Sequence, residues 1–106
     1  MADEWHTVAA VGEIDEDEPK GVEIGDKMIA VFKLGDDFHA TDNVCPHAFA
    51  LLTDGFVEDG AVECPLHAAK FDIKSGKCLA LPAEEDIATF ETKVEGDAVM
   101  VKVPAG

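Results

Sequence analysis

The sequence predicts an all-β fold, in which an antiparallel sandwich or barrel-like base carries a two-loop tip, and a single domain spans residues 1–106. Three observations support this prediction. Short apolar segments recur at regular intervals, turn residues such as Gly, Asp and Pro separate them, and no stretch sustains a helical period. A chain of 106 residues can bury one modest core but cannot also form a separate substrate domain.

The N-terminal part contains the first of these segments. Residues 5–11 form a short apolar run suited to a first strand, and residues 13–19 follow with five acids and a Pro, which is typical of a solvated loop. Residues 21–24 are a brief segment. Residues 27–34 are apolar almost throughout and have the length of a buried strand. Residues 38–41 are expected to run back antiparallel to that strand after a tight turn.

The central and C-terminal parts predict further hairpins. Residues 61–64 resemble a strand, and residues 70–73 alternate polar and apolar side chains before a turn that leads into residues 78–81. The segments 89–94 and 98–103 flank a Glu-Gly-Asp turn and are predicted to form the last hairpin. A short helical turn is possible around residues 48–52, and the pattern leaves that choice open.

Charge is the unusual feature of the composition. The chain has 23 acidic residues and 8 basic ones, with a formal net charge of −15, and it contains no Arg. Without Arg, the usual bidentate clamp for carboxylates and phosphates is missing, and nucleic acid is an improbable partner for so acidic a chain. We expect partners with basic docking faces instead. The chain has no secretory signal pattern and no long apolar run, and its number of Cys is odd, which together predict a cytoplasmic protein. A monomer is the default expectation.

Two short loops each offer one Cys and one His. In the first loop, Cys45 and His47 flank Pro46. In the second loop, Cys64 is followed by Pro65 and then by His67. Two Cys and two His are the ligands of a Rieske-type [2Fe-2S] centre, in which two His replace two Cys on one iron. The two Pro residues stiffen the loops, because each fixes a backbone angle and removes a donor that would need a partner.

These four residues allow two other interpretations. A Cys2His2 zinc site uses the same residue types but usually places both Cys before both His, whereas the order here is Cys, His, Cys, His. Ordinary core residues without a metal are the other alternative. The order of the ligands favours iron and sulfide over both.

The sequence resembles the Rieske [2Fe-2S] proteins, and in particular the small ferredoxins that serve bacterial aromatic-ring-hydroxylating dioxygenases. The resemblance extends from Trp5 to Val103. Its most specific elements are Cys45-Pro46-His47, Asp54-Gly55, Cys64-Pro65-Leu66-His67, Phe71-Asp72, Ser75-Gly76-Lys77 and Pro82.

The resemblance implies the Rieske iron–sulfur fold and one [2Fe-2S] cluster held by four residues. By position, Cys45 and Cys64 resemble the ligands of the inner iron, and His47 and His67 those of the outer iron through their Nδ1 atoms. Pro82 resembles the family's proline loop, which covers the cluster from a third side.

Three positions indicate the branch of the family. The respiratory-complex members carry a disulfide between the two loops and a Ser that donates to a cluster sulfur; the corresponding positions here hold Ala50, Leu66 and Ala69. Fewer hydrogen bonds to the sulfurs stabilise the reduced state less. The reduction potential is therefore expected near the low end of the roughly −150 to +300 mV Rieske span.

The resemblance implies an electron carrier rather than an enzyme. It would take single electrons from a flavin-dependent ferredoxin reductase and deliver them to a terminal Rieske oxygenase; the alternative is a Rieske small subunit of a larger oxidoreductase, such as an assimilatory nitrite reductase. Phe49 stands where relatives often have Gly, and it either enlarges the apolar tip or packs beneath the loop. Cys78 is predicted to be a buried structural thiol, and His6 and His39 are predicted to be ordinary strand residues.

Overall fold

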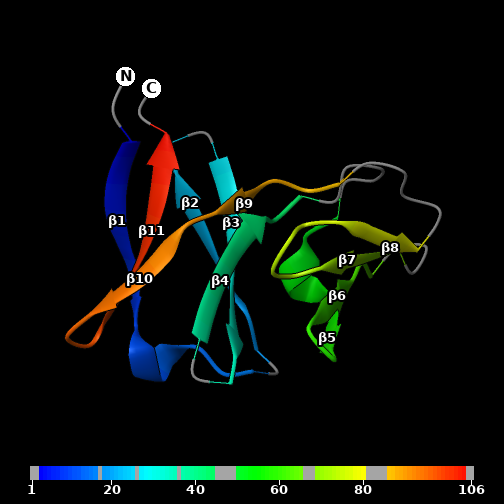
Figure 1. Cartoon of the computed structure of the whole chain (residues 1–106), viewed down its shortest axis with the longest axis horizontal. Coiled ribbons are helices and arrows are strands. Elements are labelled where there is room, and N and C mark those ends of the chain that lie inside the picture. The colour runs from blue at the N-terminus through cyan, green and yellow to red at the C-terminus, as the bar shows by residue number, and fades with distance from the viewer. Residues whose placement is uncertain are drawn as a thin grey trace.

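The computed structural model describes residues 3–16, 18–25, 27–35, 37–44, 50–65, 69–80 and 86–104. Three antiparallel sheets make up the fold, in the strand orders β1-β11-β10, β2-β3-β4-β9 and β5-β6-β7-β8. Figure 1 shows the first two sheets together as a base and the third, here called the tip sheet, to one side. The strands are β1 (Asp3–Ala10), β2 (Lys20–Ile24), β3 (Lys27–Leu34), β4 (Asp37–Asp42), β5 (Phe56–Glu58), β6 (Ala61–Glu63), β7 (Lys70–Asp72), β8 (Cys78–Ala80), β9 (Thr89–Phe90), β10 (Thr92–Glu95) and β11 (Ala98–Pro104).

The core of the base lies between its two sheets. Val99, Val101 and Val103 of β11 are all buried, as their alternation predicts, and they share one apolar core with Ile29 and Val31 of β3. Burial of apolar surface between two facing sheets is the main stabilising contribution in a sandwich. The predicted all-β antiparallel fold is therefore confirmed.

Strand β3 is buried on both faces, which explains its continuous apolar sequence. Ile29 and Val31 point into the base core, whereas Ala30 and Phe32 belong to a second core that the tip sheet shares. Side chains of a strand alternate between its two faces, so a strand with a core on each side needs apolar residues at every position. This strand joins the base to the tip.

The single Trp of the chain lies on the first base sheet. Trp5 of β1 pairs with Lys102 of β11 in the antiparallel register. The ammonium of Lys93 lies 4.4 Å from the centroid of the indole ring, and that of Lys102 lies 5.9 Å from it. Both distances allow an attraction between the cation and the ring face.

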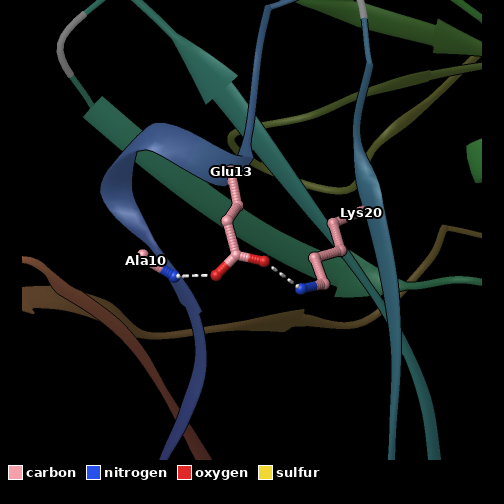
Figure 2. Close-up of polar contacts among 3 residues, drawn as sticks. All are labelled: Ala10, Glu13 and Lys20. Carbon is pink, nitrogen blue, oxygen red and sulfur yellow. Dashed lines mark hydrogen bonds and ion pairs between the residues drawn. The ribbon is translucent and has the colours of Figure 1, made fainter.

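A 3-10 helix, η1 (Val11–Glu13), connects β1 to the acidic loop. The carboxylate of Glu13 accepts a hydrogen bond of 2.9 Å from the backbone N–H of Ala10 and one of 3.0 Å from the ammonium of Lys20 (Figure 2). These two donors, the backbone bond first, hold the pKa of Glu13 below its ordinary value. One acid of the predicted solvated loop therefore has a specific structural role.

Two features differ from the sequence-based expectation. The predicted strand over residues 89–94 is split at Glu91 into β9, which pairs with β4, and β10, which pairs with β11. The chain thus passes from one base sheet to the other at this point. The short strand β5 was not predicted, and a second 3-10 helix, η2 (Leu52–Asp54), precedes it. Among the described residues, no helix is long and apolar enough to cross a membrane.

Candidate metal centre

One of the four predicted ligands, Cys64, lies in the described part of the chain. It follows β6 directly, its side chain is only 1% exposed, and it forms no disulfide. Cys45, His47 and His67 lie outside the described residues, so the four-residue ligand set stays a prediction. Phe49 and Pro82 also lie outside them.

The segment that carries Cys64 and His67 is closed at its base by the backbone. The N–H of Cys64 donates to the carbonyl oxygen of Ala69 at 2.7 Å. Beyond these residues, β6 and β7 continue as an antiparallel pair in which Glu63 lies opposite Lys70. The two ends of the segment between Cys64 and Ala69 are therefore held side by side.

The segment that carries Cys45 and His47 is closed in the same way. Val44 and Leu51 form an isolated antiparallel bridge, and the N–H of Leu52 donates to the carbonyl oxygen of Asn43 at 2.7 Å. The amide oxygen of Asn43, a buried residue, also accepts a 3.0 Å hydrogen bond from the N–H of Thr53. Asn43 thus binds the far side of this segment through both its main chain and its side chain.

The segment predicted as the proline loop is fastened at both of its ends. The carboxylate of Asp86 accepts a 2.8 Å hydrogen bond from the N–H of Cys78, and the N–H of Ile87 donates to the carbonyl oxygen of Gly76 at 2.8 Å. A Cβ on Gly76 would lie 2.1 Å from the carbonyl oxygen of Ile87, and the φ of Gly76 is +77°. Only Gly meets both conditions, which explains why the turn contains it.

The turn that contains Gly76 is ordered by Asp72. Its carboxylate accepts hydrogen bonds from the hydroxyl of Ser75 at 2.6 Å and from the N–H of Ser75 at 2.9 Å. These bonds, the hydroxyl first, lower the pKa of Asp72. The only Ser of the chain therefore has a structural role in a turn.

The bases of all three segments meet in one apolar core. Ala50 and Leu52 follow the first segment, Cys64 and Ala69 bound the second, and Ile87 follows the third, and all five belong to or pack against the same core. This core, here called the tip core, also contains Val62 and Phe71 of the tip sheet. Segments that are far apart in the sequence are thus brought to one end of the molecule.

A close backbone contact fixes the first two segments relative to each other. A Cβ on Gly55 would lie 1.9 Å from the carbonyl oxygen of Glu63, so the backbone after the first segment is in contact with the backbone just before Cys64. No side chain larger than hydrogen fits there. The Asp54-Gly55 element that carried part of the family resemblance therefore has a physical explanation.

The residues that the structure describes fit a cluster with a thiolate ligand at this position. The thiol of Cys64 is free and withdrawn from solvent, and a soft thiolate is the ligand that iron–sulfur centres use. Within the described ranges, no group of three or more His, Cys, Asp and Glu side chains could hold a metal ion. Three of the four expected ligands lie beyond those ranges.

The remaining His and Cys residues of the described ranges take ordinary positions on strands or beside the tip core. His39 on β4 is half-buried; burial and then the charge of Lys74 lower its pKa, and its Nε2 has no hydrogen-bond partner among the described residues. His6 on β1 lies 3.8 Å from the carboxylate of Glu4. Cys78 is half-buried rather than fully buried, and it packs against the tip core.

Sequence reasoning did not find the two polar residues that fasten the segments. Asn43 and Asp86 each bind backbone groups eight to ten positions away. Asn43 stands two residues before the expected ligand Cys45, and this position is the one signal in the sequence, since Asn side chains often bind nearby backbone groups.

Comparison with known proteins now defines the class. A family model described as the Rieske [2Fe-2S] domain matches residues 4–91. The chain belongs to this family, and its cofactor is one Rieske-type [2Fe-2S] cluster.

Ferredoxins are among the curated relatives of this chain. The ferredoxin component of the naphthalene 1,2-dioxygenase/salicylate 5-hydroxylase systems of Ralstonia sp is 39% identical over 103 residues, which are 97% of this chain and 99% of that protein. The anthranilate 1,2-dioxygenase ferredoxin subunit of Burkholderia cepacia is 41% identical over 100 residues, or 94% of this chain and 93% of that protein. Such ferredoxin components are electron carriers, not catalysts.

Solved structures agree with this class. The Sphingomonas yanoikuyae B1 ferredoxin superposes with a TM-score of 0.90 at 30% identity and covers 95% of this chain and 100% of its own. The ferredoxin in a complex with the reduced oxygenase of carbazole 1,9a-dioxygenase superposes with a TM-score of 0.86 at 30% identity. The match covers 92% of this chain and 91% of that ferredoxin. A nitrite reductase small subunit from Mycobacterium tuberculosis superposes with a TM-score of 0.86 at 26% identity, and the match covers 98% of each chain.

Proposed function

We propose that this protein carries single electrons from a flavin-dependent ferredoxin reductase to the terminal Rieske oxygenase of an aromatic-ring-hydroxylating dioxygenase system. The observation that carries the proposal is the end-to-end match to ferredoxin components, 97% of this chain against 99% of the Ralstonia protein. The cluster supplies a site that accepts and releases one electron. The single domain over residues 1–106 positions the cluster and provides the protein surface around it.

Four residues are proposed to hold the cluster: Cys45 and Cys64 at the inner iron, and His47 and His67 at the outer iron. The burial of Cys64 supports this assignment, because a thiolate at the tip core belongs to the end of the cluster that faces the protein. The His end then faces away from the core. An electron that resides mainly at that end can pass to another protein over a short distance.

Charge supports a role in transient docking. The formal net charge of −15 favours partners with basic faces, and it speeds their encounter at low salt. A carrier must also leave its partner readily, which small and partly polar interfaces allow. We propose that the protein acts as a monomer in the cytoplasm, where a reducing environment suits an odd number of Cys.

Anaerobic reduction tests the proposal directly. The oxidised protein is mixed with NADH and each of a panel of flavoprotein ferredoxin reductases from aromatic dioxygenase systems, and the visible absorbance is followed. We expect bleaching equivalent to one electron per protein, and reoxidation when a terminal oxygenase in its oxidised form is added. If no reductase of the panel reduces the protein, the proposal is wrong.

A second candidate function is a small subunit of a nitrite reductase. The M. tuberculosis nitrite reductase small subunit, which covers 98% of this chain, supports it, although at lower identity than the ferredoxin relatives. Gel filtration of the protein from its native host separates the two. Elution in a stable complex that reduces nitrite would favour the subunit over the diffusing carrier.

A further inference from the structure

The outer face of the tip sheet carries exposed side chains on β5, β7 and β8. Along β5, β6 and β7, the central side chains Val57, Val62 and Phe71 point toward the tip core, where Val62 and Phe71 are fully buried. The neighbouring side chains of these strands therefore lie on the opposite face. In Figure 1 this sheet forms the side of the molecule away from β1 and β11.

Two large apolar side chains are exposed on that face. Phe56 of β5 is 67% exposed and Leu79 of β8 is 56% exposed. They line the same groove of about 310 Å³, together with Ala61, with Lys70 and with the acids Glu58, Asp59 and Glu63. Single exposed apolar residues are ordinary, but an aromatic and an aliphatic side chain in one groove with a charged rim are typical of a binding surface.

The groove begins at the base of the segment that holds Cys64. Phe56 lies opposite Glu63, and Glu63 lies opposite Lys70, in the row of the sheet nearest that segment. Glu63 directly precedes Cys64, and Lys70 directly follows Ala69. Phe56 therefore lies in the row of the tip sheet that adjoins the segment of Cys64.

Charge defines the chemistry of the occupant. Three acids and one Lys surround the apolar floor of the groove, so its rim has a formal charge of −2. A protein surface with an apolar side chain flanked by Lys or Arg complements this rim, whereas an acidic surface would be repelled. Truncation of an anchoring aromatic residue at an interface usually costs much of the binding free energy.

We propose that this groove extends the docking surface around the cluster and binds an apolar side chain, flanked by basic residues, of a redox partner protein. The inference rests on the proposed electron-carrier function. It adds a surface on the side of the tip, formed by Phe56 and Leu79, to the contact expected at the His end of the cluster.

Steady-state electron transfer tests the groove. The assay uses the reductase and oxygenase pair from the panel above that turns over fastest with the unmodified protein. Phe56→Ala should raise the protein concentration for half-maximal rate by about fivefold or more, with the visible and electron-spin spectra unchanged. Val94→Ala is the matched control, because Val94 is 45% exposed but lies on β10 in the base, and it should leave that concentration unchanged.

A charge variant adds an independent readout. Glu58→Gln on the rim should flatten the decline of the rate with rising salt, whereas Glu23→Gln, an exposed acid on β2, should change the salt dependence less. Separate measurement of reduction by the reductase and reoxidation by the oxygenase identifies which partner uses the groove.

The outcomes distinguish this inference from the function on which it rests. If the Phe56→Ala protein has the same half-maximal concentration as the Val94→Ala protein in both half-reactions, the groove does not bind a redox partner. If the unmodified protein accepts no electron from any reductase, the proposed function fails, and the groove proposal fails with it.

Discussion

Replacement of Gly55 by Ala would introduce a methyl group into the closest backbone contact near Cys64. The new Cβ would lie 1.9 Å from the carbonyl oxygen of Glu63 and 3.2 Å from that of Leu52, whereas ordinary contacts begin at 3.4 Å. Gly55 has a φ of −91°, which Ala adopts readily, so the cost is steric and not conformational. The neighbouring atoms are backbone and cannot rotate away. The junction between η2 and β6 must therefore shift.

The structure allows an estimate of the effect. Overpacking in a close-packed region costs about 1–3 kcal/mol, and a clash with rigid backbone lies at the upper end, at about 3 kcal/mol. With a urea dependence of about 2 kcal/mol per M for a small domain, the midpoint of unfolding should fall by about 1.5 M. Loss of the visible absorbance of the cluster in urea measures this midpoint.

Gly12→Ala provides the matched control. A Cβ on Gly12, in η1, would have no atom within 4 Å. That variant should change the free energy of unfolding by no more than about 0.5 kcal/mol. If Gly55→Ala and Gly12→Ala bleach at the same urea concentration, the close contact with Glu63 does not exist in the protein, and the explanation of Gly55 is refuted.

Three further predictions follow from the site and from the cap of η1. Cys64→Ser should abolish the visible colour and the rhombic electron-spin signal while Cys78→Ser retains both; a coloured Cys64→Ser protein would remove that residue from the ligand set. The midpoint potential should lie toward the low end of the roughly −150 to +300 mV span because Ala69 has no hydroxyl to donate, and a potentiometric value above about +100 mV would contradict this. Since the pKa of Glu13 is lowered by Ala10 and then by Lys20, the stability that its ionised form contributes is present above its ordinary pKa of 4.5 and is lost as the pH falls through the lower folded-state value. Carbon NMR titration of that carboxyl group should give a pKa below 4.5, and a value at or above 4.5 would count against the cap.

The best-predicted element was β3, whose bounds Lys27–Leu34 match the expected segment. Its apolar run is continuous because cores lie on both faces, and such a run is visible in the sequence without any knowledge of the partners. Strand β5 was missed because it has three residues and its first, Phe56, points to solvent. The split between β9 and β10 depends on pairing with two different sheets, which local sequence does not record.

Residue type and order predict the four-residue ligand set, of which the structure describes Cys64 alone, but they do not predict the supports of its segments. Cys64 stood out because Cys and His are rare and their spacing is specific. The hydrogen bonds of Asn43 to Thr53 and of Asp86 to Cys78 depend on how segments meet after folding. In a chain with 23 acids, no sequence pattern distinguishes Asp86, whose carboxylate accepts a hydrogen bond from the N–H of Cys78, from the other acids.

The position of Trp5 gives the molecule two separate optical signals. The chain has one Trp and no Tyr, so its intrinsic fluorescence comes almost entirely from the ring that Lys93 faces on the base sheet. Under the proposed ligand assignment, the iron–sulfur chromophore lies in the other half, where Cys64 and the tip core are. Fluorescence and visible absorbance recorded on one unmodified sample therefore follow the unfolding of the base and of the tip independently. Coincident curves would mean that β3, which has a core on each face, makes the two halves a single cooperative unit.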